Sequence, residues 1–125
     1  MKIHFLTNGE ESAIKSNIPW AKIDPEIRDL VKFANEISGI ATLQSCAGHV
    51  YQDDNSGFHI EPACIVFKAN KKWTEQTIFH IVPKYGIRDV SLRYFNDGSF
   101  WIDIGVDPAE HWRLWNFFKY MKEDA

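Results

Sequence analysis

The sequence predicts an α+β fold, a two-layer sandwich in which helices pack on one face of a mostly antiparallel sheet. Its patterns follow one another as helix, two strands, helix, two strands and helix, and short turns join the paired strands. A doubly wound parallel sheet would instead need strands and helices to alternate one by one. No stretch of the 125 residues is linker-like or of low complexity, so we expect a single domain over residues 1–125.

The first helix is predicted to begin at Asp24-Pro25 and to end just before Gly39. Asp24 is a typical N-cap residue, and proline suits the first turn because its missing N–H leaves no hydrogen bond unmade. Apolar residues then recur at steps of three and four, which places on one helix face Ile27, Leu30, Val31, Ala34 and Ile37. Before this helix, residues 2–7 are expected to form an N-terminal strand.

Two strands separated by a polar loop are predicted next. Residues 40–45 alternate loosely between apolar and polar, and Ala47-Gly48 follows them as a turn. Residues 51–57 are polar and are expected to be a loop. Residues 63–69 form a short, apolar, β-branched run that is typical of a buried strand.

A second helix and a hairpin follow in the predicted order. Asn70 is expected to cap the helix, and Pro83 is expected to terminate it. The turn sequence Asn96-Asp97-Gly98 predicts a hairpin between residues 88–95 and 99–106, because Asp-Gly suits the positive φ that tight turns need. Asp107-Pro108 repeats the Asp-Pro sequence found at the start of the first helix and is expected to begin the last helix.

The last helix is rich in aromatic residues. Trp112, Trp115, Phe118 and Met121 stand at helical spacing, and other aromatic residues fall toward a second face. A helix that is apolar over so wide an arc is expected to be buried on two sides, in the core and in a homodimer interface. Base stacking is disfavoured, because no basic groove accompanies these aromatic residues.

Composition and charge disfavour several classes of protein. Fourteen basic and seventeen acidic residues give a net charge of −3, which lacks the broad positive field of most nucleic-acid-binding proteins. No apolar run approaches the ~18 residues that a membrane span needs. Two cysteines do not make a disulfide framework, so we expect a reducing, cytoplasmic location.

The stretch from Thr42 to His49 concentrates the candidate chemistry. It leaves a strand and places a hydroxyl, a thiol and an imidazole within five positions, at Ser45, Cys46 and His49. Gly48 permits a sharp bend or the close approach of a ligand, and backbone N–H groups in such a bend can bind an anion. The sequence therefore predicts a pocket at this turn, although Cys46 as a core filler beside an ordinary turn is an equally simple interpretation.

This region resembles the tRNA wybutosine-synthesising methyltransferase family. In that family, a helix led by Asp and ended by Asn runs into a strand that closes on Ser-Cys-Ser-Gly-Arg. The resemblance covers residues 23–50, with Ala47 and His49 in place of the family's second Ser and its Arg. The residues that match the family pattern are Asp24, Ile27, Leu30, Asn35, Thr42, Ser45, Cys46 and Gly48.

The resemblance implies a small methyltransferase-like protein that uses S-adenosylmethionine in tRNA modification. On this interpretation Ser45, Cys46 and His49 are the catalytic candidates, and the ligand is S-adenosylmethionine, a nucleotide or modified RNA. The ligand-binding candidates are Asp24, Thr42, Gln44 and Gly48. Asp24 is expected to cap its helix and to orient the loop. The rival class is a non-enzymatic binding or assembly protein that keeps the fold without the chemistry.

Two further interpretations concern the cysteines and histidines. A zinc site is conceivable because the spacing C-x2-H-x9-H-x4-C offers four suitable ligands in Cys46, His49, His59 and Cys64. Nucleophilic catalysis by Cys46 would require the His49 imidazole within hydrogen-bond reach of the thiol. Both interpretations have less support in the sequence than the methyltransferase-like one. The spacing lacks a second tight ligand pair, and the side chains of neighbours around a turn often point apart.

Overall fold

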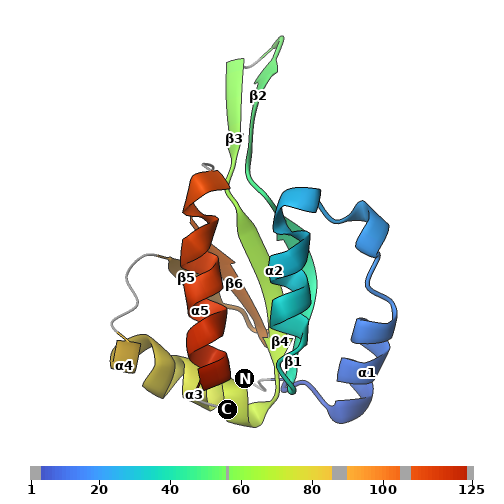
Figure 1. Cartoon of the computed structure of the whole chain (residues 1–125), viewed down its shortest axis with the longest axis vertical. Helices are drawn as coiled ribbons and strands as arrows, with labels where there is room; N and C mark the ends of the chain where they lie inside the picture. Colours follow the sequence, from blue (N-terminus) through green and yellow to red (C-terminus); the bar gives the residue numbers. More distant parts are fainter. Residues whose placement is uncertain (1–3, 56, 86–89, 105–107, 124–125) are drawn as a thin grey trace.

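The computed structural model describes residues 4–55, 57–85, 90–104 and 108–123. Its centre is a four-stranded antiparallel sheet with the strand order β1-β4-β6-β5 (Figure 1). In that order the strands are Ile40–Cys46, Cys64–Ala69, Ser99–Asp103 and Ser91–Tyr94. β1 is therefore an edge strand of the sheet.

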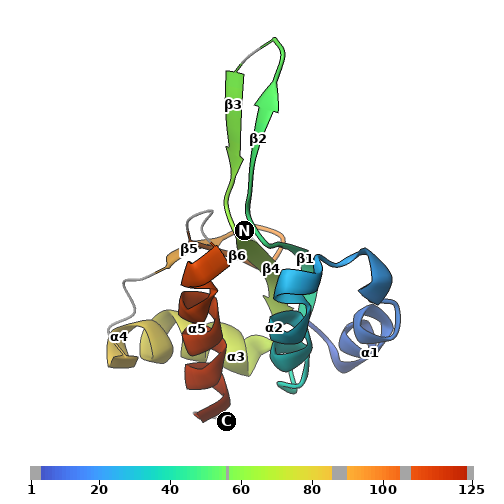
Figure 2. The same ribbon diagram turned by 45° about the horizontal axis from the view of Figure 1, so that its top comes forward.

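Helices cover one face of this sheet (Figure 2). α2 (Pro25–Asn35) and α5 (Trp112–Glu123) lie side by side across it, each preceded by a 3-10 turn, at Trp20–Lys22 and Pro108–His111. α1 (Asn8–Ser16) stands beside the edge strand β1 (Figure 1). The predicted α+β two-layer sandwich with a mostly antiparallel sheet is confirmed.

The core lies between the sheet and α2 and α5. Phe67 of β4 stacks on Phe100 of β6 with ring centroids 5.1 Å apart, and Phe118 of α5 meets the same ring edge-on at 5.5 Å. The predicted apolar face of α2 is buried, with Ile27 at 1% exposure. The helix ends at Asn35, earlier than the predicted end before Gly39, so Ile37, at 3% exposure, is buried just beyond it. The three-and-four spacing in the sequence therefore identified the correct face of this helix.

The hairpin of β2 (His49–Asp53) and β3 (Gly57–Glu61) replaces most of the predicted polar loop, and we call it the arm. It projects away from the sheet and its helices (Figures 1 and 2). Val50 lies opposite Ile60 and Gln52 opposite Phe58, so one face of the arm is mostly apolar. Phe58 is 74% exposed. The loop prediction was wrong because the acidic turn between the strands hid the apolar alternation on either side of it.

The N-terminal strand is a second correction. Lys2 and Ile3 lie outside the described residues, and residues 4–7 are not in a strand. The first element is instead α1, which begins with a capping box: Thr7 accepts the backbone N–H of Glu10, and the Glu10 carboxylate accepts the backbone N–H of Thr7. Hydrogen bonds from His4 and Thr7 lower the pKa of the Glu10 carboxyl to about 2.

The second predicted helix begins as expected and ends later. Asn70 caps α3 (Lys71–Gln76) by accepting the backbone N–H of Trp73. A π turn at Thr77–Ile81 then leads into α4 (Val82–Tyr85), so Pro83 does not terminate the helical stretch. Proline is tolerated there because it lies in the first turn of a new helical segment.

The second hairpin and the last helix agree in part with prediction. β5 and β6 flank the predicted turn, in which Gly98 has a φ of +85°, while Arg88, Val106 and Asp107 lie outside the described residues. The face of α5 differs from the expected one, because Trp112 is 48% exposed. The side chains that α5 buries are Leu114, Phe117, Phe118 and Met121. None of the described helices, α5 included, is long and apolar enough to cross a membrane.

The packing predicts very different costs for two Phe-to-Ala substitutions. Phe67→Ala should lower the free energy of unfolding by about 3–5 kcal/mol, because it leaves a cavity among packed rings. The matched variant Phe58→Ala should change it by less than about 0.5 kcal/mol, because the side chain lies on the exposed arm. Urea unfolding measures both values, and equal losses would contradict this description of the core.

Candidate functional site

The bend between β1 and β2 is held from two sides by side chains distant in the sequence. Ala47, which is fully buried, donates its backbone N–H to Asp24 Oδ2 at 3.1 Å. Its carbonyl oxygen accepts a hydrogen bond from His111 Nε2 at 2.7 Å. Gly48 completes the bend with a φ of +92°, a conformation that favours glycine. The bend is therefore fixed relative to the starts of both α2 and α5.

Asp24 serves this bend and does not cap its helix. Although it occupies the N-cap position of α2, its side chain makes no capping hydrogen bond. Its Oδ2 atom instead accepts the Ala47 N–H and lies 3.1 Å from His49 Nε2. The expected capping role was wrong, because the carboxylate is turned toward the loop. Its expected role in orienting that loop agrees with these contacts.

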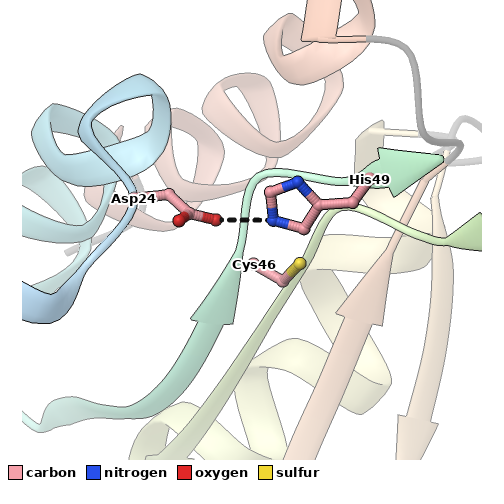
Figure 3. A group of neighbouring side chains, drawn as sticks. All are labelled: Asp24, Cys46 and His49. Atoms are coloured by element: carbon pink, nitrogen blue, oxygen red, sulfur yellow. Dashed lines mark hydrogen bonds and ion pairs between the residues drawn. The ribbon is translucent and has the colours of Figure 1, made fainter. Parts of the chain in front are cut away.

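Asp24, Cys46 and His49 form one compact cluster at the base of the arm (Figure 3). One carboxylate oxygen, the thiol sulfur and one imidazole nitrogen all lie within 4.8 Å of one another. The side chains of His49 and Asp24 are 47% and 37% exposed, and Cys46 is partly buried. The cluster is thus accessible to solvent and to small ligands.

The bend also orients the donor atoms of the cluster. Gly48 donates its backbone N–H to Cys46 Sγ at 3.4 Å, while the Ala47 N–H binds the Asp24 carboxylate. Such contacts to ligand atoms are a usual feature of metal sites, where they fix the ligands and tune their basicity. Tetrahedral zinc bound to one sulfur and two lighter atoms needs donor atoms about 3.3–3.6 Å apart. The Asp24 and His49 donor atoms, 3.1 Å apart, are already close to that spacing, and the thiol sulfur lies within 4.8 Å of both.

The two other residues of the predicted zinc spacing lie elsewhere. His59 is on the arm, where its ring stacks on Tyr51 with centroids 5.1 Å apart. Cys64 begins β4 and is 6% exposed; burial, with a smaller contribution from the nearby Cys46, raises the pKa of its thiol to about 11. Of the predicted four, the structure brings only Cys46 and His49 into the cluster, and it adds Asp24.

Three other predicted site residues, the catalytic candidate Ser45 and the ligand-binding candidates Thr42 and Gln44, lie away from the cluster. Thr42, Gln44 and Ser45 line an open cavity of about 450 Å³ between β1 and the segment from α1 to the following 3-10 turn. The polar atoms of Thr42 are engaged by Asn35, whose amide nitrogen donates to Thr42 Oγ1 at 2.8 Å and whose oxygen accepts the Thr42 N–H at 3.1 Å. Gln44 and Ser45 are left to offer polar groups to a ligand.

The hydrogen bonds of Cys46 and His49 bear on nucleophilic catalysis by the Cys46 thiol. The His49 imidazole is hydrogen bonded to Asp24, and Cys46 Sγ accepts the Gly48 N–H. A nucleophilic pair would need the imidazole to bond the thiol itself. The described contacts therefore favour three groups that face a common centre over a thiol activated by its neighbour.

His111 is a site residue that the sequence did not indicate. It is buried, at 8% exposure, against the bend. Its partner Ala47 is 64 residues away, so no local pattern could reveal the contact.

Comparison of the chain with known protein families, curated proteins and solved structures gives no match in any of the three.

The hydrogen bond from His111 to the Ala47 carbonyl oxygen predicts how substitutions of His111 change the stability of the protein. His111→Ala should lower the free energy of unfolding by about 1–3 kcal/mol, because the buried Ala47 carbonyl loses its partner. His111→Gln retains an N–H donor and should restore part of that loss. Urea unfolding compares the two variants, and a Gln variant no more stable than the Ala variant would show that the hydrogen bond contributes little.

Proposed function

We propose that the protein is a zinc-binding domain whose metal is held by Asp24, Cys46 and His49. The observation that supports it is the convergence of carboxylate, thiol and imidazole within 4.8 Å at one solvent-accessible point. Thiolate and imidazole favour zinc over magnesium or calcium, which prefer all-oxygen sites. Zinc binds cysteine as the thiolate and histidine as the neutral imidazole, so its affinity for this site should fall as the pH is lowered.

The ligand count favours a functional zinc over a structural one. Structural zinc sites are closed by four protein ligands, whereas catalytic sites use three and keep a position for water or substrate. This cluster offers three, and two of its side chains are more than one-third exposed. The core of the domain, with Phe67 and Phe100 at 0% exposure, is formed by apolar side chains and includes none of the three cluster residues. A zinc ion here would polarise a bound water or carbonyl oxygen.

The zinc proposal predicts different behaviour for two histidines. Protein purified without chelators and loaded with zinc should hold one ion per chain by elemental analysis. His49→Ala should lose most of that zinc, because it removes one of three ligands. His59→Ala should retain it, because His59 stacks on Tyr51 outside the cluster.

Circular dichroism of both variants controls for folding, and Cys46→Ser should abolish the cobalt–thiolate absorption band of cobalt-loaded protein. Equal zinc loss in the two histidine variants, or no zinc in the parent protein, would contradict the proposal.

The second candidate is the methyltransferase-like function that the family resemblance implies. A cavity of about 450 Å³ that combines apolar residues with Lys22, Gln44 and Ser45 is of the size and composition of small-molecule sites. The Lys22 ammonium suits a carboxylate or phosphate group, as S-adenosylmethionine or a nucleotide would supply. Modified RNA is less favoured, because the net charge of the chain is −3.

Ligand-induced stabilisation tests this second candidate. S-adenosylmethionine, S-adenosylhomocysteine or a nucleotide at ~100 times its Kd should add about 2.7 kcal/mol to the free energy of unfolding. Gln44→Ala should reduce the shift, and the matched arm variant Gln52→Ala should preserve it. The absence of a thermal shift with all of these ligands, and of RNA binding at low salt, would exclude the methyltransferase-like function.

The assembly and location of the protein stay predictions. A homodimer through the C-terminal helix would use the exposed Trp112, since the other large side chains of α5 are mostly committed to the core. A reducing cytoplasm is consistent with the two free thiols of Cys46 and Cys64.

A further inference from the structure

The two cysteines of the chain face each other across the β1–β4 pair. Cys46 is the last residue of β1, Cys64 is the first of β4, and the two are direct partners in the antiparallel register. Directly opposed residues have Cα atoms about 4.5–5.5 Å apart and side chains on the same face of the sheet. Disulfides join cysteines whose Cα atoms are about 4.4–6.8 Å apart. The strand pairing thus meets the main distance requirement for a bond between them.

The two thiols differ in access. Both are free, but Cys46 is partly exposed at the cluster and Cys64 is 6% exposed beneath it. A small oxidant therefore reaches Cys46 first. Cys64 is placed to attack the oxidised sulfur from the neighbouring strand, which is the role of a resolving cysteine.

We propose that Cys46 and Cys64 form a reversible disulfide on exposure to a peroxide, and that this bond withdraws Cys46 from the zinc site. The first half depends only on the strand register, and the second half rests on the proposed zinc function. The protein would then bind zinc when reduced and release it when oxidised.

The chemistry balances with one hydrogen peroxide per chain. The Cys46 sulfur attacks one peroxide oxygen, the O–O bond breaks, and the other oxygen leaves as water, so that Cys46 becomes a sulfenic acid. The Cys64 sulfur then attacks the Cys46 sulfur, the S–O bond breaks, and a second water leaves with the thiol proton. Two thiols lose two electrons in total, and the peroxide accepts both.

The position of this bond connects it to the rest of the site. It would close a loop over residues 47–63, which contains the bend and the whole arm. Cys46 is the sole sulfur ligand of the cluster, because Cys64 is not a member of it. Oxidation would therefore leave Asp24 and His49 as two ligands, which is too few for the proposed zinc site.

Peptide mapping of the full chain tests the disulfide. No Lys or Arg separates the two cysteines, so a protease that cuts after Asp or Glu is needed to cleave between them, at Asp53 or Asp54. After treatment with one to two equivalents of peroxide, unreduced digests should contain the Cys46 and Cys64 peptides joined, with both thiols recovered on reduction. Cys46→Ala should leave Cys64 reduced, and Cys64→Ala should leave Cys46 as a sulfenic acid that a 1,3-diketone traps.

The outcomes separate this inference from the zinc proposal. Cys46 over-oxidised beside a free Cys64 in the parent protein, or disulfides only between chains, would overturn the inference whatever the zinc result. A Cys46–Cys64 disulfide in a protein that never bound zinc would support the bond and contradict the switch. In zinc-loaded protein, we expect one zinc released per disulfide formed and rebinding after reduction; zinc retained in the disulfide form would also contradict the switch.

Discussion

The hydrogen bond from the Ala47 N–H to the Asp24 carboxylate is the contact on which the site depends. It joins the bend after β1 to the start of α2, two segments 23 residues apart. The same carboxylate oxygen meets His49, while Cys46 precedes the bend directly. Without this contact, no hydrogen bond would tie the Asp24 carboxylate to the bend, and the thiol and imidazole would lack a third donor group beside them.

Three elements of the fold supply this arrangement. The end of β1 gives Cys46, the start of α2 gives Asp24, and the residue before α5 gives His111, whose hydrogen bond holds the bend from the other side. The packing of Phe67 between sheet and helices keeps these elements at fixed distances. The exposed cluster is therefore positioned by a rigid core, which preorganises the metal ligands and the pair of thiols.

Local patterns explain which parts of the fold could be predicted. Three predictions were confirmed because each depends on residues close together in the sequence. They concern the apolar spacing of α2, the β-branched run of β4 and the Asp-Gly turn before β6. The arm was missed because its apolar alternation spans an acidic turn, and α1 was missed although the capping box at Thr7 and Glu10 signals a helix start. The Asp24 carboxylate could serve a cap or a loop, and only tertiary contacts decide between them.

Zinc-edge X-ray absorption of the zinc-loaded protein tests the central claim most directly, because it reports the donor atoms around the metal. A single sulfur at about 2.3 Å with nitrogen and oxygen donors near 2.0–2.2 Å is the expected first coordination shell. Replacement of Cys46 by serine should remove the sulfur contribution. A shell with two sulfurs, or one composed only of nitrogen and oxygen, would show that the metal is held elsewhere or by a different set of residues.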